Sequence, residues 1–190
     1  MTISGETIDY GPCAFMDQYH PKTVFSSIDK LGRYAYSNQP PITKWNLARF
    51  AECLIPLIDK NEEAAIKIAT DVIDNFQNIY KKKWLNMMRD KLGLFGEDKN
   101  DRKLIDDLLN WMEKNKIDYT NIFWHLMDIK IDNNTYKDKT FLTWFDEWKK
   151  RYKLNNYSKE KQIELMKKNN PIVIPRNYKV EEALTEANNG

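Results

Sequence analysis

The chain has 190 residues, of which 42% are hydrophobic and 13% aromatic, so it can bury a core and is not intrinsically disordered. Its 30 Lys and Arg residues against 28 Asp and Glu residues leave a net charge of +2, which argues against a dedicated nucleic-acid binder. The chain has two cysteines without a Cys-x-x-Cys spacing, which predicts neither a disulfide framework nor a zinc site. It shows no leader-like N-terminus and no apolar stretch of ~18 residues, so we expect a cytoplasmic protein without a membrane span.

Glycine and proline concentrate in the first 60 residues, which therefore differ in character from the rest of the chain. Two short β-prone runs around Ser4-Gly5 predict a small N-terminal β-hairpin that ends at Asp9. Residues 10–39 show little periodicity and predict one long loop. Ordered loops longer than ~12 residues are uncommon and often functional, so this loop is a candidate site before any motif is considered.

A first helix is expected directly after this loop. Pro40-Pro41 suit its first turn, and apolar residues follow at spacings of three and four from Trp45 to Leu54. Pro56 should end or kink this helix.

The second helix is the strongest local prediction. Asn61 can cap it, and Glu62-Glu63 in the first turn complement the helix dipole. Apolar residues from Ala65 to Met88 keep to one face, and Gly93 should stop the helix.

Periodicity and capping signals predict further helices at 101–113, at 119–129 behind Asp118, at 140–152, at 159–168 behind Ser158, and at 178–188. We therefore expect a single, mainly α-helical domain over residues 1–190. Its residues 1–60 form the hairpin, the loop and the first helix, and its residues 61–190 form a helical bundle.

Asp9-Tyr10-Gly11-Pro12 is the segment with the clearest link to chemistry. A carboxylate that leaves a strand just before a flexible glycine is suited to binding Mg²⁺ together with phosphate oxygens. Asp followed by Gly-Pro is also a common turn, and these four residues alone favour the turn.

Other candidates have simpler structural interpretations. His125 is expected to be a packed or surface histidine, and Lys81-Lys82-Lys83 a solvated helix face. The aromatic stripe between Phe141 and Trp148 is expected to be core. Arg33 and Arg49 could each bind a phosphate or carboxylate, or form structural ion pairs.

Taken in order, several blocks closely resemble the selenoprotein O family of pseudokinases, which adenylylate (AMPylate) proteins. The N-terminal blocks are Asp9-Tyr10-Gly11-Pro12, Phe15-Met16-Asp17, Tyr19, Pro21, Asp29, Gly32-Arg33-Tyr34, Asn38-Gln39-Pro40 and Trp45-Asn46-Leu47-Ala48-Arg49. The later blocks are Lys91-Leu92-Gly93-Leu94, Asp118-Tyr119-Thr120-Asn121, Asn170-Pro171 and Pro175-Arg176-Asn177. The resemblance covers nearly the whole chain and overrides the turn interpretation of Asp9.

The resemblance implies a protein-kinase-like fold, of which this chain is a C-lobe fragment with a helical C-terminal extension. The loop over residues 10–39 corresponds to the activation segment, which in kinases shapes the protein-substrate side of the cleft. We expect Arg33, Asn46 and Arg49 to fix this loop on the following helix rather than to touch nucleotide.

The resemblance also implies the chemistry. The family transfers AMP from ATP to Ser, Thr or Tyr hydroxyls of proteins, and its DYGP aspartate matches the metal-binding aspartate of the kinase D-F-G element. Asp9 is therefore the expected cofactor-binding and metal residue, holding Mg²⁺ against ATP. No catalytic residue is expected within this chain.

The family's catalytic aspartate, its second metal-binding asparagine and its N-lobe match nothing in residues 1–190. The longer parent is therefore expected to be the enzyme and the isolated chain to be inactive. Expected partners are the protein substrates and the N-lobe, with no nucleic acid and no membrane. The alternative is a non-catalytic helical interaction module, whose exposed apolar surface predicts self-association.

Overall fold

The computed structural model describes residues 14–128, 134–154 and 157–190, and these are mainly helical. The elements in order are η1 (Tyr36–Asn38), α1 (Gln39–Ile58), α2 (Glu62–Lys91), α3 (Asp101–Asn115), α4 (Asn121–Asp128), η2 (Asn134–Lys137), α5 (Lys139–Lys153), α6 (Lys159–Asn169) and α7 (Asn177–Asn189). The predicted hairpin and Asp9 lie outside the described residues. Within these residues, strand-like pairing is limited to one isolated bridge between Gln18 and Asp118.

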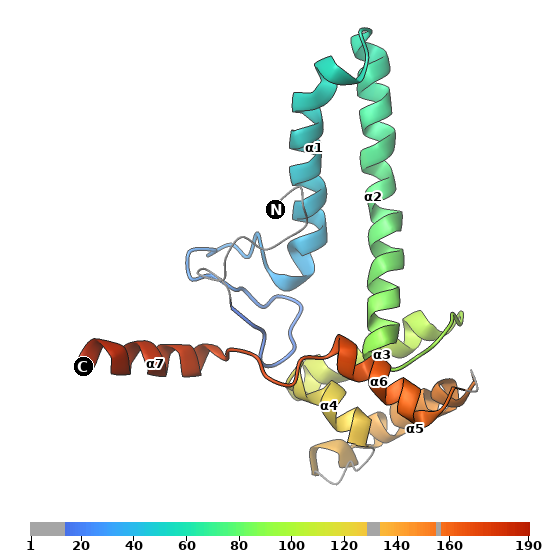
Figure 1. The fold of residues 1–190 in the computed structure, drawn as a ribbon, viewed down its shortest axis with the longest axis vertical. Helices are drawn as coiled ribbons and strands as arrows, with labels where there is room; N and C mark the ends of the chain where they lie inside the picture. Colours follow the sequence, from blue (N-terminus) through green and yellow to red (C-terminus); the bar gives the residue numbers. More distant parts are fainter. Residues whose placement is uncertain (1–13, 129–133, 155–156) are drawn as a thin grey trace.

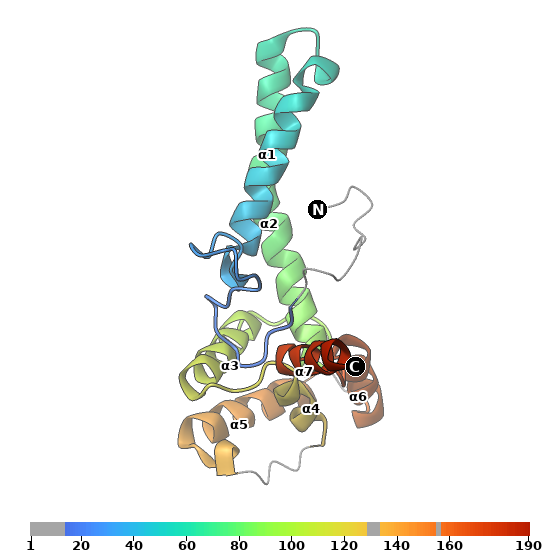
Figure 2. The ribbon, with the colours of Figure 1, turned by 90° about the vertical axis from the view of Figure 1, so that its left-hand side faces the viewer.

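The helices form a tall hairpin on a compact base. In Figures 1 and 2, α1 and α2 stand side by side and antiparallel above a cluster formed by α3, α4, α5 and α6. The end of α2 enters this cluster and contacts α3 and α6. Helix α7 reaches sideways from the cluster and has no buried residue.

The predicted helix ends are largely confirmed. Helix α1 has proline in its first turn, and it continues through Pro56 to end at Ile58. The Asn61 side chain caps α2 by accepting a hydrogen bond from the Ala64 amide at 3.0 Å. Asp118 and Ser158 likewise accept hydrogen bonds from the first turns of α4 and α6.

Gly93 ends α2 as expected, and the structure shows why glycine is required there. Its φ of +68° is a left-handed conformation that side chains rarely adopt. A Cβ at this position would lie 2.9 Å from Cγ of Met166 on α6. The position therefore excludes a side chain for two independent reasons.

The predicted apolar face of α2 is only partly buried. Ala65 and Met88 are buried, whereas Val72 is 66% exposed and Ile79 51% exposed. Among the described elements, α1 is the one that lies against the upper part of α2, and a single helix covers a narrow stripe of a neighbour. Periodicity identified the apolar side of this helix, but not how much of it is covered.

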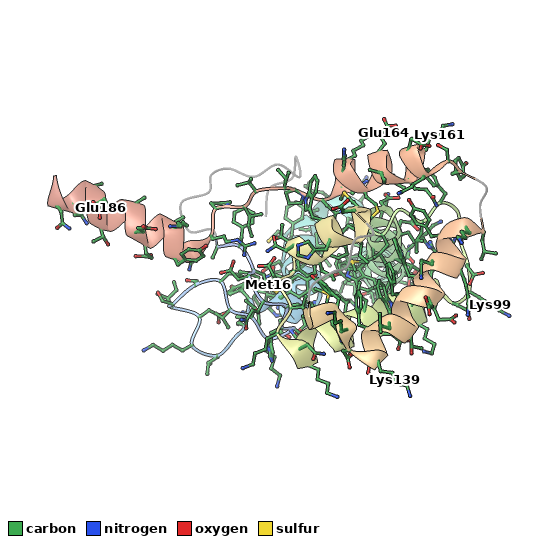
Figure 3. All side chains as sticks on the ribbon, turned by 90° about the horizontal axis from the view of Figure 1, so that it is seen from below. Met16, Lys99, Lys139, Lys161, Glu164 and Glu186 are labelled. Carbon is green, nitrogen blue, oxygen red and sulfur yellow. The ribbon has the colours of Figure 1, made fainter. Side chains whose placement is uncertain are left out.

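The main hydrophobic core lies in the base. It is built from residues of α3, α4, α5, α6 and the end of α2, and the fully buried side chains include Phe123, Phe141 and Trp148. The aromatic stripe of α5 is core, as predicted. Its indole N–H groups are satisfied, because Trp144 donates to the Leu104 carbonyl at 2.8 Å and Trp148 donates to the Leu92 carbonyl at 3.1 Å. Figure 3 shows many side chains gathered between the helices of the base, with Lys161 and Glu164 directed outward.

A buried ion cluster joins three elements of this base. Asp101, which is 0% exposed, accepts hydrogen bonds at 2.6 Å from Arg89 of α2 and from Arg151 of α5. Burial acts to raise the pKa of Asp101, but hydrogen bonds from Arg151, the Asp98 amide and Arg89 outweigh it and lower the pKa below 3.8. The carboxylate therefore stays ionised and links the first helix of the base to its neighbours.

Among the described helices, none is both long enough and apolar enough to cross a membrane.

Candidate functional site

The residue with the clearest predicted role, Asp9, lies outside the described residues, which begin at Ala14. The site is therefore built from the loop that follows Asp9, residues 14–38, and from what holds this loop in place. In Figure 1 the loop runs from the base of the molecule to the start of α1, on the side away from α2.

The start of the loop pairs with the turn between α3 and α4. The Tyr19 amide donates to the Ile117 carbonyl at 2.8 Å, and the Tyr119 amide donates to the Asp17 carbonyl at 2.7 Å. The rings of Tyr19 and Tyr119 stack with centroids 5.7 Å apart, and Tyr36 packs edge-on against both. Both ends of the loop therefore lie on the same part of the core.

An ion cluster reinforces this attachment from the C-terminal end of the chain. The guanidinium of Arg176 binds the carboxylate of Asp17, and it also donates to Asp118 at 2.6 Å. The hydrogen bond with Asp118 is the main cause of the raised pKa of Arg176, and the bond with Asp17 adds to it. We call Arg176, Asp17 and Asp118 the Arg176 clamp. It joins the segment just before α7 to a residue that lies eight positions after Asp9.

The tyrosines at the loop attachment are structural rather than acid–base groups. Burial is the largest cause of the raised pKa of Tyr19, which is about 12, and it also raises the pKa of Tyr119 well above 10. Their hydroxyls therefore remain protonated at neutral pH and cannot serve as general bases there.

A buried lysine lies beside these rings. Burial lowers the pKa of Lys91 to about 8. Its Nζ donates to the Asn169 carbonyl at 3.3 Å and lies 4.5 Å from the ring centroid of Phe123. Asn170 in turn donates to the Lys91 carbonyl at 2.9 Å. Lys91 thus ties the end of α2 to the end of α6.

The far part of the loop rests on α1. The guanidinium carbon of Arg33 lies 4.8 Å from the ring centroid of Trp45, and that of Arg49 lies 5.6 Å from the same ring. Arg49 also pairs with Glu52. The structure thus brings Arg33 and Arg49 together on one indole ring. Asn46 is exposed and makes no side-chain hydrogen bond to another described residue.

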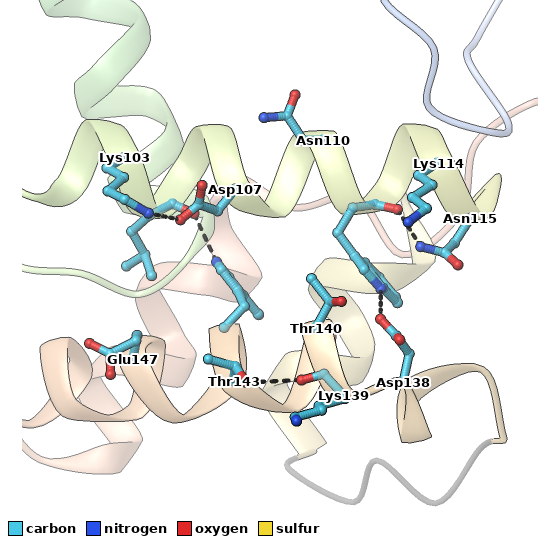
Figure 4. Close-up of a pocket in the computed structure, with 13 residues that line it drawn as sticks. Lys103, Asp107, Asn110, Lys114, Asn115, Asp138, Lys139, Thr140, Thr143 and Glu147 are labelled. Atoms are coloured by element: carbon cyan, nitrogen blue, oxygen red, sulfur yellow. Dashed lines mark hydrogen bonds and ion pairs between the residues drawn. The ribbon is translucent and has the colours of Figure 1, made fainter.

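A groove of about 680 Å³ lies between α3 and α5. Several of its polar groups are engaged with one another, as Figure 4 shows. Lys103 binds Asp107 at 2.5 Å, the Trp111 indole donates to Asp138 at 2.8 Å, and the Thr143 hydroxyl donates to the Lys139 carbonyl at 3.0 Å. These engaged groups are therefore not free ligands, and no three His, Cys, Asp or Glu side chains of the described residues gather there for a metal.

The remaining sequence candidates have the structural roles expected of them. His125 contacts the Tyr136 hydroxyl at 2.5 Å, and Lys81 to Lys83 are exposed on α2. Across the part of the chain that the structure describes, no three His, Cys, Asp or Glu side chains gather as a metal site would require.

From the sequence, Asp118 is expected only to cap a helix, and Asp17 and Arg176 have no expected role. Each of them lies within one of the blocks that carry the family resemblance, and this is the one signal that could have drawn attention to them. Their meeting could not be read from spacing, because Arg176 and Asp17 are 159 positions apart.

Comparisons with known proteins agree with the sequence blocks. A protein-family model described as "Protein adenylyltransferase SelO" matches residues 1–189. The chain is 63% identical over 191 residues to "Protein nucleotidyltransferase YdiU" of Pelagibacter ubique, and 56% identical over 188 residues to the protein of that name in Clostridium botulinum. It is 51% identical over 185 residues to the protein of that name in Nitrosococcus oceani. These matches cover 100%, 98% and 97% of this chain but only 40%, 38% and 38% of the relatives, so the chain spans about two fifths of their length.

Proposed function

The chain belongs to the protein adenylyltransferase SelO family, and we propose that it is part of a longer enzyme that transfers AMP from ATP to Ser, Thr or Tyr hydroxyls of proteins. The family match over residues 1–189 is the observation that carries this proposal. Because the relatives are more than twice as long as this chain, the activity, the substrates and the partners are assigned to the longer enzyme.

Within that enzyme the chain takes the place of a kinase-like C-lobe with a helical extension. The order of its elements supports this assignment, because a long loop leads into α1 and a helical base follows. The loop takes the place of an activation segment, and its position on the outer side of α1 leaves it open to a protein substrate.

Asp9 is the residue assigned to Mg²⁺ and ATP. A carboxylate is the ligand type that Mg²⁺ prefers, and the described residues hold no complete metal site, so Asp9 would be one member of a set completed by the rest of the enzyme. When bound, Mg²⁺ neutralises charge on the phosphate oxygens as AMP is transferred.

The described residues contribute position rather than chemistry. The Arg176 clamp and the amide pairing of Tyr19 and Tyr119 hold the chain soon after Asp9 on the helical base. We therefore expect the described part of the chain to hold Asp17 and the loop that follows it on the base, which is a positioning role in the proposed transfer.

A chimera tests the assignment of Asp9. Residues 1–190 replace the matching 40% of the Pelagibacter ubique relative, and AMP transfer from labelled ATP with Mg²⁺ is measured. We expect Asp9→Ala to reduce transfer by on the order of 100-fold or more, since a bound metal contributes several kcal/mol of charge stabilisation. Asp71→Ala, at an exposed position on α2, is the matched control and should transfer normally. Undiminished transfer by Asp9→Ala would remove Asp9 from its role.

The isolated chain is proposed to be inactive. We expect calorimetry with ATP and Mg²⁺ to record no binding to residues 1–190 alone, because the described part of the chain lacks a complete ligand set. A measurable heat of binding that Asp9→Ala abolishes would contradict this proposal.

We also propose a cytoplasmic location. It is supported by the sparse use of cysteine, and the described Cys53 is free and exposed, as suits a reducing compartment. Recovery of the tagged protein in the membrane or secreted fraction of its own cells would contradict the proposal.

A second candidate function is supported by the exposed α1–α2 hairpin. Trp45 is 48% exposed, Val72 66% and Leu57 82%. Several large apolar side chains exposed on the same pair of helices are unusual for the surface of a monomeric soluble protein. The chain acting alone would then be a helical interaction module that self-associates.

A further inference from the structure

Residues 25–34 of the loop are held by a network of hydrogen bonds although they lie at the surface. Both carboxylate oxygens of Asp29 accept backbone hydrogen bonds at 2.8 Å, one from the Arg33 amide and the other from the Tyr34 amide. The Gly32 amide donates to the Asp29 carbonyl at 3.1 Å, and the Asn38 side chain donates to the Gly32 carbonyl at 2.7 Å. Such a network fixes the backbone without help from a hydrophobic core.

This fixed backbone holds large apolar side chains in water. Ile28 is 87% exposed and Leu31 is 96% exposed, and together with Phe25 and Tyr34 they border a hollow of about 730 Å³. We call this hollow, which is bordered by the apolar side chains of Phe25, Ile28, Leu31 and Tyr34, the loop hollow. An isolated exposed leucine needs no explanation, but several large apolar side chains held together at the surface by a hydrogen-bonded loop suit a protein-binding surface.

The rim of the loop hollow is positively charged. Lys30 and Arg33 lie on it, and neither pairs with a carboxylate within the described residues. The only acid on the rim, Asp29, has both oxygens engaged by the loop's own amides. Arg33 is held over the Trp45 ring at 4.8 Å, so its guanidinium is already ordered before any partner binds. The hollow is thus complementary to an apolar side chain with carboxylates beside it.

We propose that the loop hollow binds a segment of the protein substrate, with an apolar side chain inserted between Ile28 and Leu31 and a neighbouring acidic side chain at Arg33. This inference rests on the proposed AMP transfer to proteins, and it specifies the class of substrate segment that the enzyme selects. The loop hollow would select among acceptor proteins through the apolar and acidic side chains near the reacting hydroxyl rather than through the hydroxyl itself. Acidic segments with one large apolar residue are therefore the preferred acceptors.

Peptide binding to residues 1–190 tests the inference without relying on activity. The probes are two fluorescein-labelled peptides of equal length with the same Phe and Tyr, one flanked by Glu and the other by Lys. We expect fluorescence anisotropy to show the Glu peptide binding at least about tenfold more tightly. Leu31→Ser should weaken this binding by about tenfold or more because it removes buried apolar contact. Arg33→Glu should abolish or reverse the preference between the peptides.

The matched control is Leu57→Ser, which removes another exposed leucine, 82% exposed against 96% for Leu31, from the far end of α1 and should leave peptide binding unchanged. Equal binding of the two peptides, or weakening by Leu57→Ser as strong as that by Leu31→Ser, would overturn the inference.

The chimera separates this inference from the proposed function. If the unsubstituted chimera transfers AMP to the Glu peptide, Leu31→Ser should raise the KM for that peptide by about tenfold or more while the KM for ATP stays the same. If the chimera transfers no AMP at all, the proposed function fails, and anisotropy still decides whether the hollow binds the peptide. If Leu31→Ser lowers the melting temperature of the chimera without changing the KM for the peptide, the hollow is an internal contact of the longer enzyme and the inference is wrong.

Discussion

At the scale of single residues, a few ion pairs between distant parts of the chain hold the candidate site together. Arg176 lies before α7, Asp17 lies in the loop and Asp118 lies before α4, so one guanidinium connects three segments. Its side chain is 20% exposed, which leaves these contacts only partly screened by solvent. The clamp is therefore a better candidate for a stabilising interaction than the surface pairs on α3, α5 and α7.

Arg176→Ala should loosen the loop more than it destabilises the whole domain. We expect a loss of about 1–2 kcal/mol, since charge-assisted hydrogen bonds are lost and two carboxylates are left without their partner. Hydrogen exchange measures the local part, and the Tyr19 and Tyr119 amides should exchange several-fold faster, because both lie in the pairing that the clamp reinforces.

The control for this experiment is Lys179→Ala, which breaks an exposed pair with Glu182 on α7 and should leave both amides unchanged. Unchanged exchange in Arg176→Ala would mean that the backbone pairing and the tyrosine stack hold the loop without the clamp.

Asp101 should determine part of the acid stability of the base. Its folded pKa lies below 3.8, so it contributes stability that is present above the ordinary pKa and is lost as the pH falls through the folded pKa. Asp101→Asn removes this charge and leaves Arg89 and Arg151 buried without it, which should cost about 3–5 kcal/mol at pH 7.

Urea unfolding between pH 7 and pH 2 measures both effects. The difference in free energy of unfolding between the wild type and Asp101→Asn should shrink below about pH 4. A difference that stays constant down to pH 2 would show that the charge of Asp101 is not what links the helices. Asp107→Asn, at an exposed acid on α3, serves as the control and should show no such difference.

At the scale of secondary-structure elements, the two ends of α2 differ in how much of the helix is packed against neighbours. The end of α2 is tightly specified, because Gly93 turns the chain and α6 packs directly over it. Within the described residues the upper part pairs with α1, and a pocket between the two helices is lined by small and medium side chains such as Ala51, Ala69 and Ile73. The base of α2 should therefore be the last part of the hairpin to unfold.

Gly93→Ala should destabilise the base, and Gly32→Ala is its matched comparison. Both glycines have a φ near +67°, namely +68° and +66°, so both substitutions carry a backbone cost of about 1 kcal/mol. At Gly32 the nearest atom to the added Cβ is 3.7 Å away, whereas at Gly93 it is 2.9 Å away. Thermal melting should show the larger loss for Gly93→Ala, by about 1–2 kcal/mol more. Equal losses would show that Met166 moves aside freely.

At the scale of the whole molecule, the described chain is unevenly covered. The base buries most of its aromatic and aliphatic side chains, while α1, the upper part of α2 and α7 expose many large apolar residues. Since the chain spans about two fifths of its relatives, such surfaces are what a segment of a larger protein would show.

The isolated chain is therefore expected to self-associate. Sedimentation velocity should show a weight-average mass that rises with concentration, and Val72→Glu should shift it toward the monomer by placing a charge on the exposed face. Lys82→Glu, on the solvated face of the same helix, should not do so. A strict monomer at high concentration would count against both the exposed interface and the interaction-module alternative.

The sequence by itself determined the helices of the described residues and the family. The ends of the helices follow from local signals. Asn61 and Ser158 cap helices through hydrogen bonds to residues three positions away, and Gly93 ends α2 because its own backbone adopts a positive φ. The sequence blocks identified the family because they extend over almost the whole chain, as the match over residues 1–189 confirms.

Only the tertiary structure decided which residues meet. Arg176 finds Asp17 and Asp118, and Arg89 and Arg151 share Asp101, because packing of the base brings distant segments together and no spacing rule records that. Periodicity also showed that α2 has an apolar side, but the exposure of Val72 depends on which neighbours are present, and α1 is the neighbour that lies beside it. A sequence pattern gives the preference of each residue for burial, whereas burial itself is a property of the assembled chain.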